Sequence, residues 1–196
     1  MQPLGGQTLI SHVINTAKAS SENITVVVGH KKDLLKEHVA AIDPKIKITD
    51  QDEQLGTAHA VKTAAHMIQD DEKILILYGD VPLISSSTID SLISAQQECT
   101  LLSMHLSDPT GYGRIMKDDQ NNALKIIEQK DASAEEALIH EVFTGILLIN
   151  GSLLKASLEE INNQNSANEY YLTDLVEILS SKGVKINCIQ ANPTEV

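Results

Sequence analysis

The stretch KILILYGDVP, residues 73–82, decides the fold class of this chain. Its apolar run from Ile74 to Leu77 is followed by Gly79 and Asp80. A run that is apolar on both faces predicts a strand covered by helices on both sides, as in a parallel sheet. Because ligands of open α/β sheets bind outside the carboxyl ends of such strands, Asp80 is a candidate ligand of Mg2+ carrying a phosphate. The alternative is that Asp80 only caps the following turn or helix.

Helical spacing and strand-like runs alternate through the first half of the chain. Pro3, Gly5 and Gly6 predict a loop over residues 1–7. The patterns beyond it predict helices over 8–17, 31–42, 57–68 and 85–93, and strands over 24–28, 46–49 and 73–78. This alternation is typical of an α/β protein with a layered, mostly parallel sheet.

The second half changes character and predicts a mixed sheet. Asn121-Asn122 joins two strand-like arms, which indicates a hairpin. Strands are expected over 99–106, from Arg114 toward the hairpin turn, and over 123–128, 142–149 and 185–189, and helices over 152–161 and 171–180. The sequence has neither an internal repeat nor a long linker, and it lacks the hexapeptide pattern of a β-helix. We therefore expect residues 1–196 to form a single domain.

Composition excludes several classes of function. A net charge of −12 argues against a nucleic-acid-binding surface but is compatible with a small phosphorylated ligand. Cys99 and Cys188 are too few for a disulfide framework or a metal knuckle. No apolar run reaches the roughly 18 residues that a membrane span needs, and MQPLGGQ is not a signal peptide. We expect a cytoplasmic protein that binds neither membrane nor nucleic acid.

The loop 51–57, QDEQLGT, joins a predicted strand to a predicted helix. Gly56 lets the backbone approach a ligand closely, and the helix beyond it presents free N–H groups. A base, a ribose or a phosphate could dock there. The alternative is an ordinary strand-to-helix turn with Thr57 as its cap.

A second candidate loop, DPTGYGR over residues 108–114, precedes a strand. Such a loop can fold over a sugar, with Gly113 offering its backbone and Arg114 its charge. Otherwise it is a turn whose Arg114 is a surface cation. Glu128 ends a strand and could accept hydrogen bonds from sugar hydroxyls, or it could be a solvated strand-end carboxylate.

His59 and His66 lie seven residues apart on one predicted helix, near one face. No carboxylate or cysteine completes a metal-binding set around them. Solvation or core packing is therefore the favoured interpretation of both histidines.

Six motifs occur together in the order and spacing of one family. They are EQLGTAHA (53–60), ILYGDVPLI (76–84), DPTGYGRI (108–115), EQKD (128–131), TGILLING (144–151) and NEYYLTD (168–174). Over nearly its whole length the chain resembles the N-terminal uridylyltransferase domain of the bacterial bifunctional N-acetylglucosamine-1-phosphate uridylyltransferase/glucosamine-1-phosphate acetyltransferase. The resemblance implies a Rossmann-like nucleotide-diphospho-sugar transferase fold. It also implies the reaction of UTP with N-acetylglucosamine 1-phosphate to give UDP-N-acetylglucosamine and pyrophosphate, which feeds peptidoglycan and lipopolysaccharide synthesis.

The resemblance also assigns roles to individual residues. Asp80 would be the catalytic Mg2+ ligand, and positioning together with this ion would carry most of the catalysis. A general base is not strictly needed, because a sugar phosphate is already an anionic nucleophile. The implied substrate-binding residues are Gln51 for the uracil edge, Gly56 and Thr57 for base and ribose, Tyr78, Gly79 and Asp80 along ribose, phosphates and sugar, and Gly113 and Glu128 for N-acetylglucosamine.

Three departures from the family are visible. The chain begins at Met1 after the family's first strand and Gly-rich triphosphate loop, and it ends at Val196 before a second Mg2+ ligand and the acetyltransferase β-helix. Phe143 stands where the family has an asparagine that contacts the sugar. The first strand would lie between the strands at 24–28 and 73–78, so two inner sheet edges should be unpaired. We therefore expect little turnover from this polypeptide alone.

Two other interpretations stay open. Because Phe143 alters the sugar pocket, the chain could be a related pyrophosphorylase for another sugar 1-phosphate or base. It could also be a non-catalytic fragment that binds UDP-sugar weakly. Such a fragment could associate through exposed sheet edges with a second copy or with a separately encoded first strand.

Overall fold

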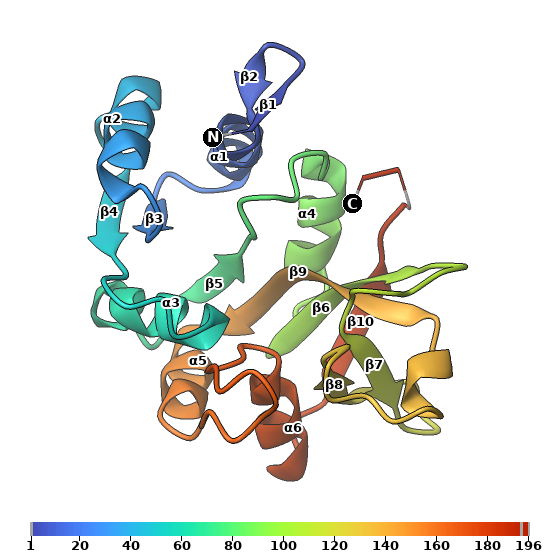
Figure 1. Ribbon diagram of the computed structural model, residues 1–196. Helices are drawn as coiled ribbons and strands as arrows, with labels where there is room; N and C mark the ends of the chain where they lie inside the picture. Colours follow the sequence, from blue (N-terminus) through green and yellow to red (C-terminus); the bar gives the residue numbers. More distant parts are fainter. Residues whose placement is uncertain (1, 193, 196) are drawn as a thin grey trace.

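A computed structural model describes residues 2–192 and 194–195 of the chain (Figure 1). Met1 and Val196, the two ends of the chain, lie outside the described residues. The first half contains β1 (Pro3–Leu4), β2 (Gln7–Thr8), α1 (Leu9–Ser20), β3 (Thr25–Val28), α2 (Lys32–Ile42), β4 (Lys47–Asp50), α3 (Thr57–Ala64), the 3-10 helix η1 (Ala65–Met67), β5 (Lys73–Ile76) and α4 (Ser86–Ser94). The second half contains β6 (Cys99–His105), β7 (Arg114–Lys117), β8 (Ala123–Ile127), the 3-10 helix η2 (Glu136–Leu138), β9 (Glu141–Asn150), α5 (Gly151–Leu158), α6 (Asp174–Ser181) and β10 (Ile186–Gln190).

The predicted helices and strands are found, with bounds that differ by a few residues. The loop predicted over residues 1–7 is wrong, because β1 and β2 form a short antiparallel ladder in which Pro3 pairs with Thr8. Gly5 and Gly6, at φ +56 and +86, make the turn between the two strands. The same glycines that suggested a loop are therefore the turn of a hairpin.

The main sheet is mixed, as predicted, with the order β10-β6-β9-β7-β8 and β5 paired to β9. Strands β5, β6, β7 and β10 share one direction, as expected for a mostly parallel sheet, while β8 and β9 run the opposite way. Many of the hydrogen-bonded pairs are nevertheless antiparallel, because β9 lies between β6, β5 and β7. Within the described residues the parallel pairs are β10 with β6 and β3 with β4. β9 is a long strand, buried along nearly all of its length, which enters the middle of the sheet in the opposite direction.

Strands β3 and β4 form a separate two-stranded sheet. In the part of the chain that the structure describes, β3 pairs only with β4 and β5 pairs only with β9. One edge of β3 and one edge of β5 therefore have no strand partner in the described residues, and the two strands belong to separate sheets (Figure 1). The two unpaired inner edges that the resemblance implied are confirmed.

Two apolar clusters cover the opposite faces of β6 and β9. One packs the sheet against α3, α5 and α6, and includes Leu101, Leu147 and Leu175. The other packs it against α4, and includes Leu102 and Ile146. Successive strand residues thus enter opposite layers, which is the two-sided burial that the apolar runs predicted.

β5 contributes to both clusters, with Ile74 and Ile76 on one side and Leu75 and Leu77 on the other. These side chains are only half-buried, since one edge of the strand is unpaired.

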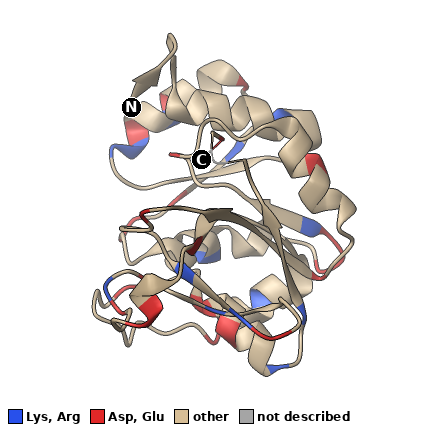
Figure 2. Ribbon diagram, turned by 90° about the vertical axis from the view of Figure 1, so that its right-hand side faces the viewer, with Lys and Arg blue, Asp and Glu red and all other residues tan. Residues whose placement is uncertain are grey.

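No helix in the described ranges is both long and apolar enough to cross a bilayer. Lys and Arg are interspersed with Asp and Glu along the chain (Figure 2).

Candidate active site

Loop 51–57 lies at the carboxyl end of β4 and is fixed by backbone contacts. Gly56 has φ +115, and a Cβ on it would lie 2.5 Å from the carbonyl oxygen of Tyr170. The Tyr170 N–H donates to the Leu55 carbonyl at 2.7 Å, and the Ala58 N–H donates to the Tyr170 carbonyl at 2.9 Å. Only glycine fits at position 56, because a side chain there would be both strained and crowded.

The side chains of this loop are engaged as well. Gln51 donates through Nε2 to the Gly56 carbonyl at 3.0 Å, and the same nitrogen lies 3.1 Å from Nδ1 of His59. The Thr57 hydroxyl accepts a hydrogen bond from the Leu172 N–H at 2.9 Å. The alternative interpretation of Thr57 as the helix cap is wrong, since Gly56 is the N-cap residue of α3 and Thr57 lies inside the helix.

Tyr78 follows β5 and packs against β9. A Cβ on Gly145, which has φ +85, would lie 2.5 Å from the Tyr78 ring. The Phe143 ring lies edge-on to the same ring, with centroids 6.4 Å apart. Burial raises the pKa of the Tyr78 hydroxyl to about 12, and the nearby Glu128 and Asp80 carboxylates add to that rise. The Tyr78 hydroxyl is therefore protonated and neutral, and it lies near two candidate binding residues, Glu128 and Asp80.

Gly79 and Asp80 lie in an exposed turn beyond Tyr78. The turn is closed by a hydrogen bond from the Val81 N–H to the Tyr78 carbonyl at 3.3 Å. The alternative that Asp80 caps a helix is wrong, because Ser85 caps α4. Among the described residues the Asp80 carboxylate has no hydrogen-bond or ion-pair partner, so it is free to bind a ligand.

Gly113 and Glu128 lie next to each other on the β7–β8 side. Gly113 is buried, and a Cβ there would lie 2.8 Å from Ile126 Cγ2 and 3.8 Å from the Glu128 carboxylate. Thr173 donates its hydroxyl to Glu128 Oε1 at 2.9 Å. Burial raises the pKa of the Glu128 carboxyl, and the carboxylate of Asp131 contributes. Glu128 is thus partly desolvated rather than the freely solvated carboxylate of the alternative interpretation.

A cavity of about 180 Å³ adjoins this pair; its lining residues are Gly111, Glu128, Gln129, Lys130, Glu169 and Tyr171. Arg114 is buried beside it and is 2% exposed, so its interpretation as a surface cation is wrong. Its guanidinium donates to the Tyr112 carbonyl and to Gln129 Oε1, while its Nε has no partner among the described residues. Gln129 Oε1 also accepts from the Gly111 N–H at 3.1 Å, so this amide fixes the loop from two directions.

Phe143 lies between the two halves of the site. Its backbone N–H donates to the Gly113 carbonyl at 2.9 Å, and its side chain is only 6% exposed. Position 143 therefore presents a buried apolar ring beside Tyr78, with no side-chain hydrogen-bond donor. Thr173, which donates to Glu128, was not among the predicted candidates, although its place in the NEYYLTD motif carried the signal.

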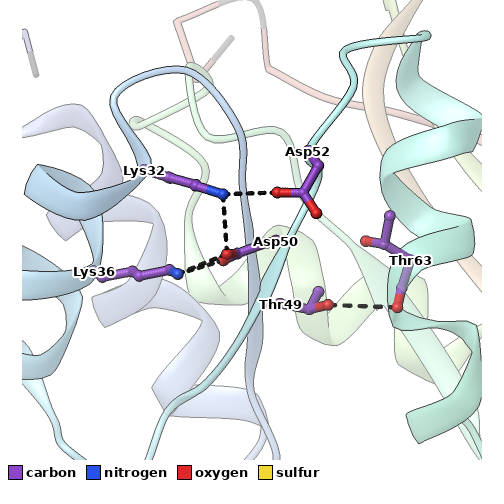
Figure 3. A network of polar contacts seen from close by, with 6 residues as sticks. All are labelled: Lys32, Lys36, Thr49, Asp50, Asp52 and Thr63. Carbon is purple, nitrogen blue, oxygen red and sulfur yellow. Dashed lines mark hydrogen bonds and ion pairs between the residues drawn. The ribbon is translucent and has the colours of Figure 1, made fainter.

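A larger cavity of about 430 Å³ opens at the carboxyl ends of β3 and β4; its lining residues are Gly29, Lys31, Lys32, Asp33, Leu34, Gln51 and Asp52. Lys32 bridges Asp52 at 2.7 Å and Asp50 at 3.3 Å, and Lys36 pairs with Asp50 at 2.7 Å. Figure 3 shows both lysines directed at these carboxylates. The hydrogen bond from Lys36 lowers the pKa of Asp50. These pairs tie α2 to the chain on either side of Gln51.

No set of three or more His, Cys, Asp and Glu side chains in the described ranges is placed to hold a metal ion. His66 is exposed and His59 bonds to Gln51, so the two histidines do not form a metal site. The residues fit Mg2+ only in one manner, with Asp80 as a single protein carboxylate and the remaining ligands supplied by phosphates and water.

Solved structures place the fold in a known class. One is a protein of Bacillus anthracis assigned as a glucose-1-phosphate thymidylyltransferase and crystallised with sucrose, with a TM-score of 0.71 at 16% identity, covering 97% of this chain and 77% of that one. Another is UDP-glucose pyrophosphorylase with UDP-glucose, with a TM-score of 0.74 at 19% identity, covering 97% of this chain and 81% of that one. The fold is that of the Rossmann-like sugar nucleotidyltransferases.

A family model, the MobA-like NTP transferase domain, matches residues 1–138. The chain belongs to this family of nucleotidyltransferase domains. Curated relatives named bifunctional protein GlmU match nearly the whole of this chain. The Ralstonia nicotianae protein is 44% identical over 189 residues, and the match covers 95% of this chain and 41% of that protein. The Clostridioides difficile protein is 42% identical over 195 residues, covering 97% of this chain and 42% of its own length. The resemblance seen in the motifs is confirmed, and the chain spans about two fifths of these relatives.

Proposed function

We propose that this chain holds the substrate site for the transfer of UMP from UTP to N-acetylglucosamine 1-phosphate, which yields UDP-N-acetylglucosamine and pyrophosphate. One observation carries the proposal: the candidate residues lie along an unbroken line of contacts. Gln51 bonds to Gly56, Thr57 borders Tyr78, and Tyr78 packs on Phe143. From Phe143 the line continues through Gly113 to Glu128.

The order along this line matches the order of groups in a UDP-sugar. The base and ribose lie at Gln51, Gly56 and Thr57, and the sugar lies at Gly113 and Glu128. The diphosphate then runs past the exposed turn that carries Gly79 and Asp80. This arrangement favours a reaction at a phosphate, because both parts of the product are held on either side of the bond that forms.

In the reaction, an oxygen of N-acetylglucosamine 1-phosphate attacks the α-phosphorus of UTP as the bond to pyrophosphate breaks. A Mg2+ ion held by Asp80 would supply positive charge that neutralises the phosphate oxygens. The chain itself contributes position: Glu128 accepts from sugar hydroxyls, and Gly113 lets the sugar approach the backbone. The sugar phosphate attacks as an anion, so none of these residues has to remove a proton.

Phe143 favours a second candidate, a pyrophosphorylase that takes another sugar 1-phosphate. Its buried ring has no hydrogen-bond donor for an acetamido group, and it fills the position where the family has asparagine. Glucose 1-phosphate, which lacks the acetamido group, is the substrate that this difference would favour.

Calorimetric titration of the chain with UDP-N-acetylglucosamine, UDP-glucose and dTDP-glucose, each with and without Mg2+, tests both candidates. The proposed function predicts micromolar binding of UDP-N-acetylglucosamine that strengthens with Mg2+. Tighter binding of UDP-glucose would favour the second candidate. A folded chain that binds none of the three nucleotide sugars would contradict both candidates. If one of them binds, a pyrophosphate-release assay with the corresponding nucleoside triphosphate and sugar 1-phosphate measures turnover.

Two accompanying properties are part of the proposal. A sugar-nucleotide synthesis step implies a cytoplasmic location, where UTP is available. The unpaired edges of β3 and β5 leave backbone groups open to strand pairing, which favours self-association of two copies. Sedimentation velocity over a range of concentrations would detect a dimer, and a monomer at all concentrations would contradict the self-association.

A further inference from the structure

The amide of Gln51 has both of its N–H hydrogens directed to the protein. Its Nε2 lies 3.0 Å from the Gly56 carbonyl oxygen and 3.1 Å from His59 Nδ1. A carbonyl oxygen can only accept a hydrogen bond, so the nitrogen of the amide, not its oxygen, must face Gly56. The Gly56 carbonyl identifies the nitrogen side of the amide, and it shares the task of holding that orientation with His59.

This orientation also fixes the state of His59. Because the group facing His59 is an N–H donor, Nδ1 of His59 must carry a lone pair, and the ring proton of the neutral imidazole must be on Nε2. His59 lies in the first turns of α3, and its ring is tilted against Tyr170 at a centroid distance of 6.5 Å. Two neighbouring elements thus hold the imidazole that accepts from Gln51.

The oxygen of the amide is the part left for a ligand. Gln51 Oε1 lies 3.5 Å from the position that a Cβ on Gly29 would take. Gly29 and Gln51 line the cavity of about 430 Å³ at the carboxyl ends of β3 and β4. The site therefore presents a hydrogen-bond acceptor, and no amide donor, next to this cavity.

We infer that His59 is a positioning residue that locks Gln51 with its oxygen toward the ligand, so that the site selects a base bearing an imide N–H. Uracil and thymine carry hydrogen on N3 and donate to this oxygen. Cytosine has a lone pair on N3, so two acceptors would face each other. The inference rests on the proposed function, because it takes Gln51 as the residue that reads the base.

The size of the effect follows from the mismatch. Leaving a buried acceptor against another acceptor costs about 1–3 kcal/mol, which corresponds to roughly 5- to 150-fold in affinity. Without His59, the Gln51 nitrogen keeps only the Gly56 carbonyl as a partner. The amide can then rotate and offer its N–H to cytosine, so discrimination falls while the pocket itself remains.

The nucleotide test compares UDP with CDP by calorimetry in the wild type, His59→Asn and His59→Leu. The amide oxygen of asparagine sits the same number of bonds from the backbone as Nδ1 and can accept from Gln51, whereas leucine cannot. We expect a UDP preference of at least about tenfold in the wild type, retained in His59→Asn and reduced to about threefold or less in His59→Leu. A full preference in His59→Leu, or an equal weakening of UDP and CDP, would overturn the inference in favour of a packing role.

A second measurement needs no nucleotide. Long-range ¹⁵N–¹H correlation on the labelled wild-type chain reports which ring nitrogen of His59 carries the proton. We expect the Nε2–H form, and a proton on Nδ1 in the neutral ring would overturn the inference even if every variant folds poorly. If the wild type binds neither UDP nor CDP, the proposed function and the base selectivity fail, while this measurement still decides whether His59 orients Gln51.

Discussion

The backbone of Tyr170 lies where a side chain at Gly56 would have to be, with 2.5 Å between that Cβ position and the Tyr170 carbonyl oxygen. The same oxygen accepts from the Ala58 N–H at 2.9 Å. The loop at the end of β4 is therefore joined to the segment that precedes α6. Since Tyr171 lines the smaller cavity, the candidate base site and the candidate sugar site are parts of one packed unit.

Replacing Gly56 with alanine should damage this unit severely. The new Cβ would meet the Tyr170 backbone, and φ +115 is unfavourable for any L residue. We expect a loss of about 3 kcal/mol in the free energy of unfolding, measured by urea denaturation, together with weaker binding of UDP.

Gly183→Ala is the matched control, because Gly183 has φ +80 but nothing within 4 Å of its Cβ position. It should lose only about 1 kcal/mol, which is the cost of the backbone conformation alone. Equal losses in the two variants would show that the contact with Tyr170 is unimportant.

Asp174 should make the chain less stable as the pH rises. Burial, followed by repulsion from Glu177 and Glu128, raises its pKa from 3.8 to about 6, despite its favourable place at the start of α6. A carboxyl with a raised pKa stabilises the fold below pH 3.8, and this stabilisation is lost as the pH rises through about 6. Asp174→Asn should therefore be more stable than the wild type at pH 7.5, by about 1 kcal/mol after solvent screening, and equally stable near pH 4.

Asp43 serves as the control for this prediction, because its pKa is lowered, whereas that of Asp174 is raised. The hydrogen bond from Lys18 lowers the pKa of Asp43, so its contribution is present at neutral pH and is lost as the pH falls. Asp43→Asn should be less stable than the wild type at pH 7.5. Denaturation curves at several pH values check both variants, and a shift in the same direction for both would contradict the assignment.

Glu128→Gln should weaken sugar binding without affecting the nucleotide. The amide keeps the shape and can still accept from Thr173, but it loses the charge that strengthens hydrogen bonds from sugar hydroxyls. We expect about tenfold weaker binding of UDP-N-acetylglucosamine and unchanged binding of UDP, measured by calorimetry. Glu135→Gln, an exposed position, serves as the control. A parallel loss for UDP would move Glu128 out of the sugar site.

Asp80→Asn should remove the effect of Mg2+ on binding. Its carboxylate is exposed and without a partner in the described part of the chain, so the substitution removes charge without disturbing the fold. We expect UDP-N-acetylglucosamine to bind equally well with and without Mg2+ in this variant, whereas Mg2+ strengthens binding in Asp90→Asn on α4. Persistent strengthening in Asp80→Asn would contradict the role of Asp80 as the metal ligand.

Gln129→Leu should loosen the loop over the smaller cavity. Its side-chain oxygen accepts from Arg114 and from the Gly111 N–H, so leucine leaves a buried guanidinium with fewer partners. We expect a loss of about 2–3 kcal/mol in unfolding free energy. Gln120→Leu, in the exposed β7–β8 turn, should be nearly neutral in the same urea titration.

Local sequence patterns predicted the helices and strands but not how the strands pair in the sheet. The runs of Ile, Leu and Val predicted β5, β6 and β9 and their burial between two layers. They could not give the direction of β9, because strand direction depends on which neighbours its edges meet and not on its own residues. The hairpin at Gly5-Gly6 was missed because two residues in each strand are too few to show a period.

The chain's sequence by itself determined the alternation of helices and strands, the family through its six motifs, and the glycines at positions 56 and 113, since these follow from local spacing and residue type. Only the tertiary structure decided that Arg114 is buried, that Phe143 packs on Tyr78, and that Gln51 bonds to His59. Each of these depends on contacts between different segments of the chain or on which of several possible hydrogen-bond partners a polar atom takes. A local sequence pattern specifies neither.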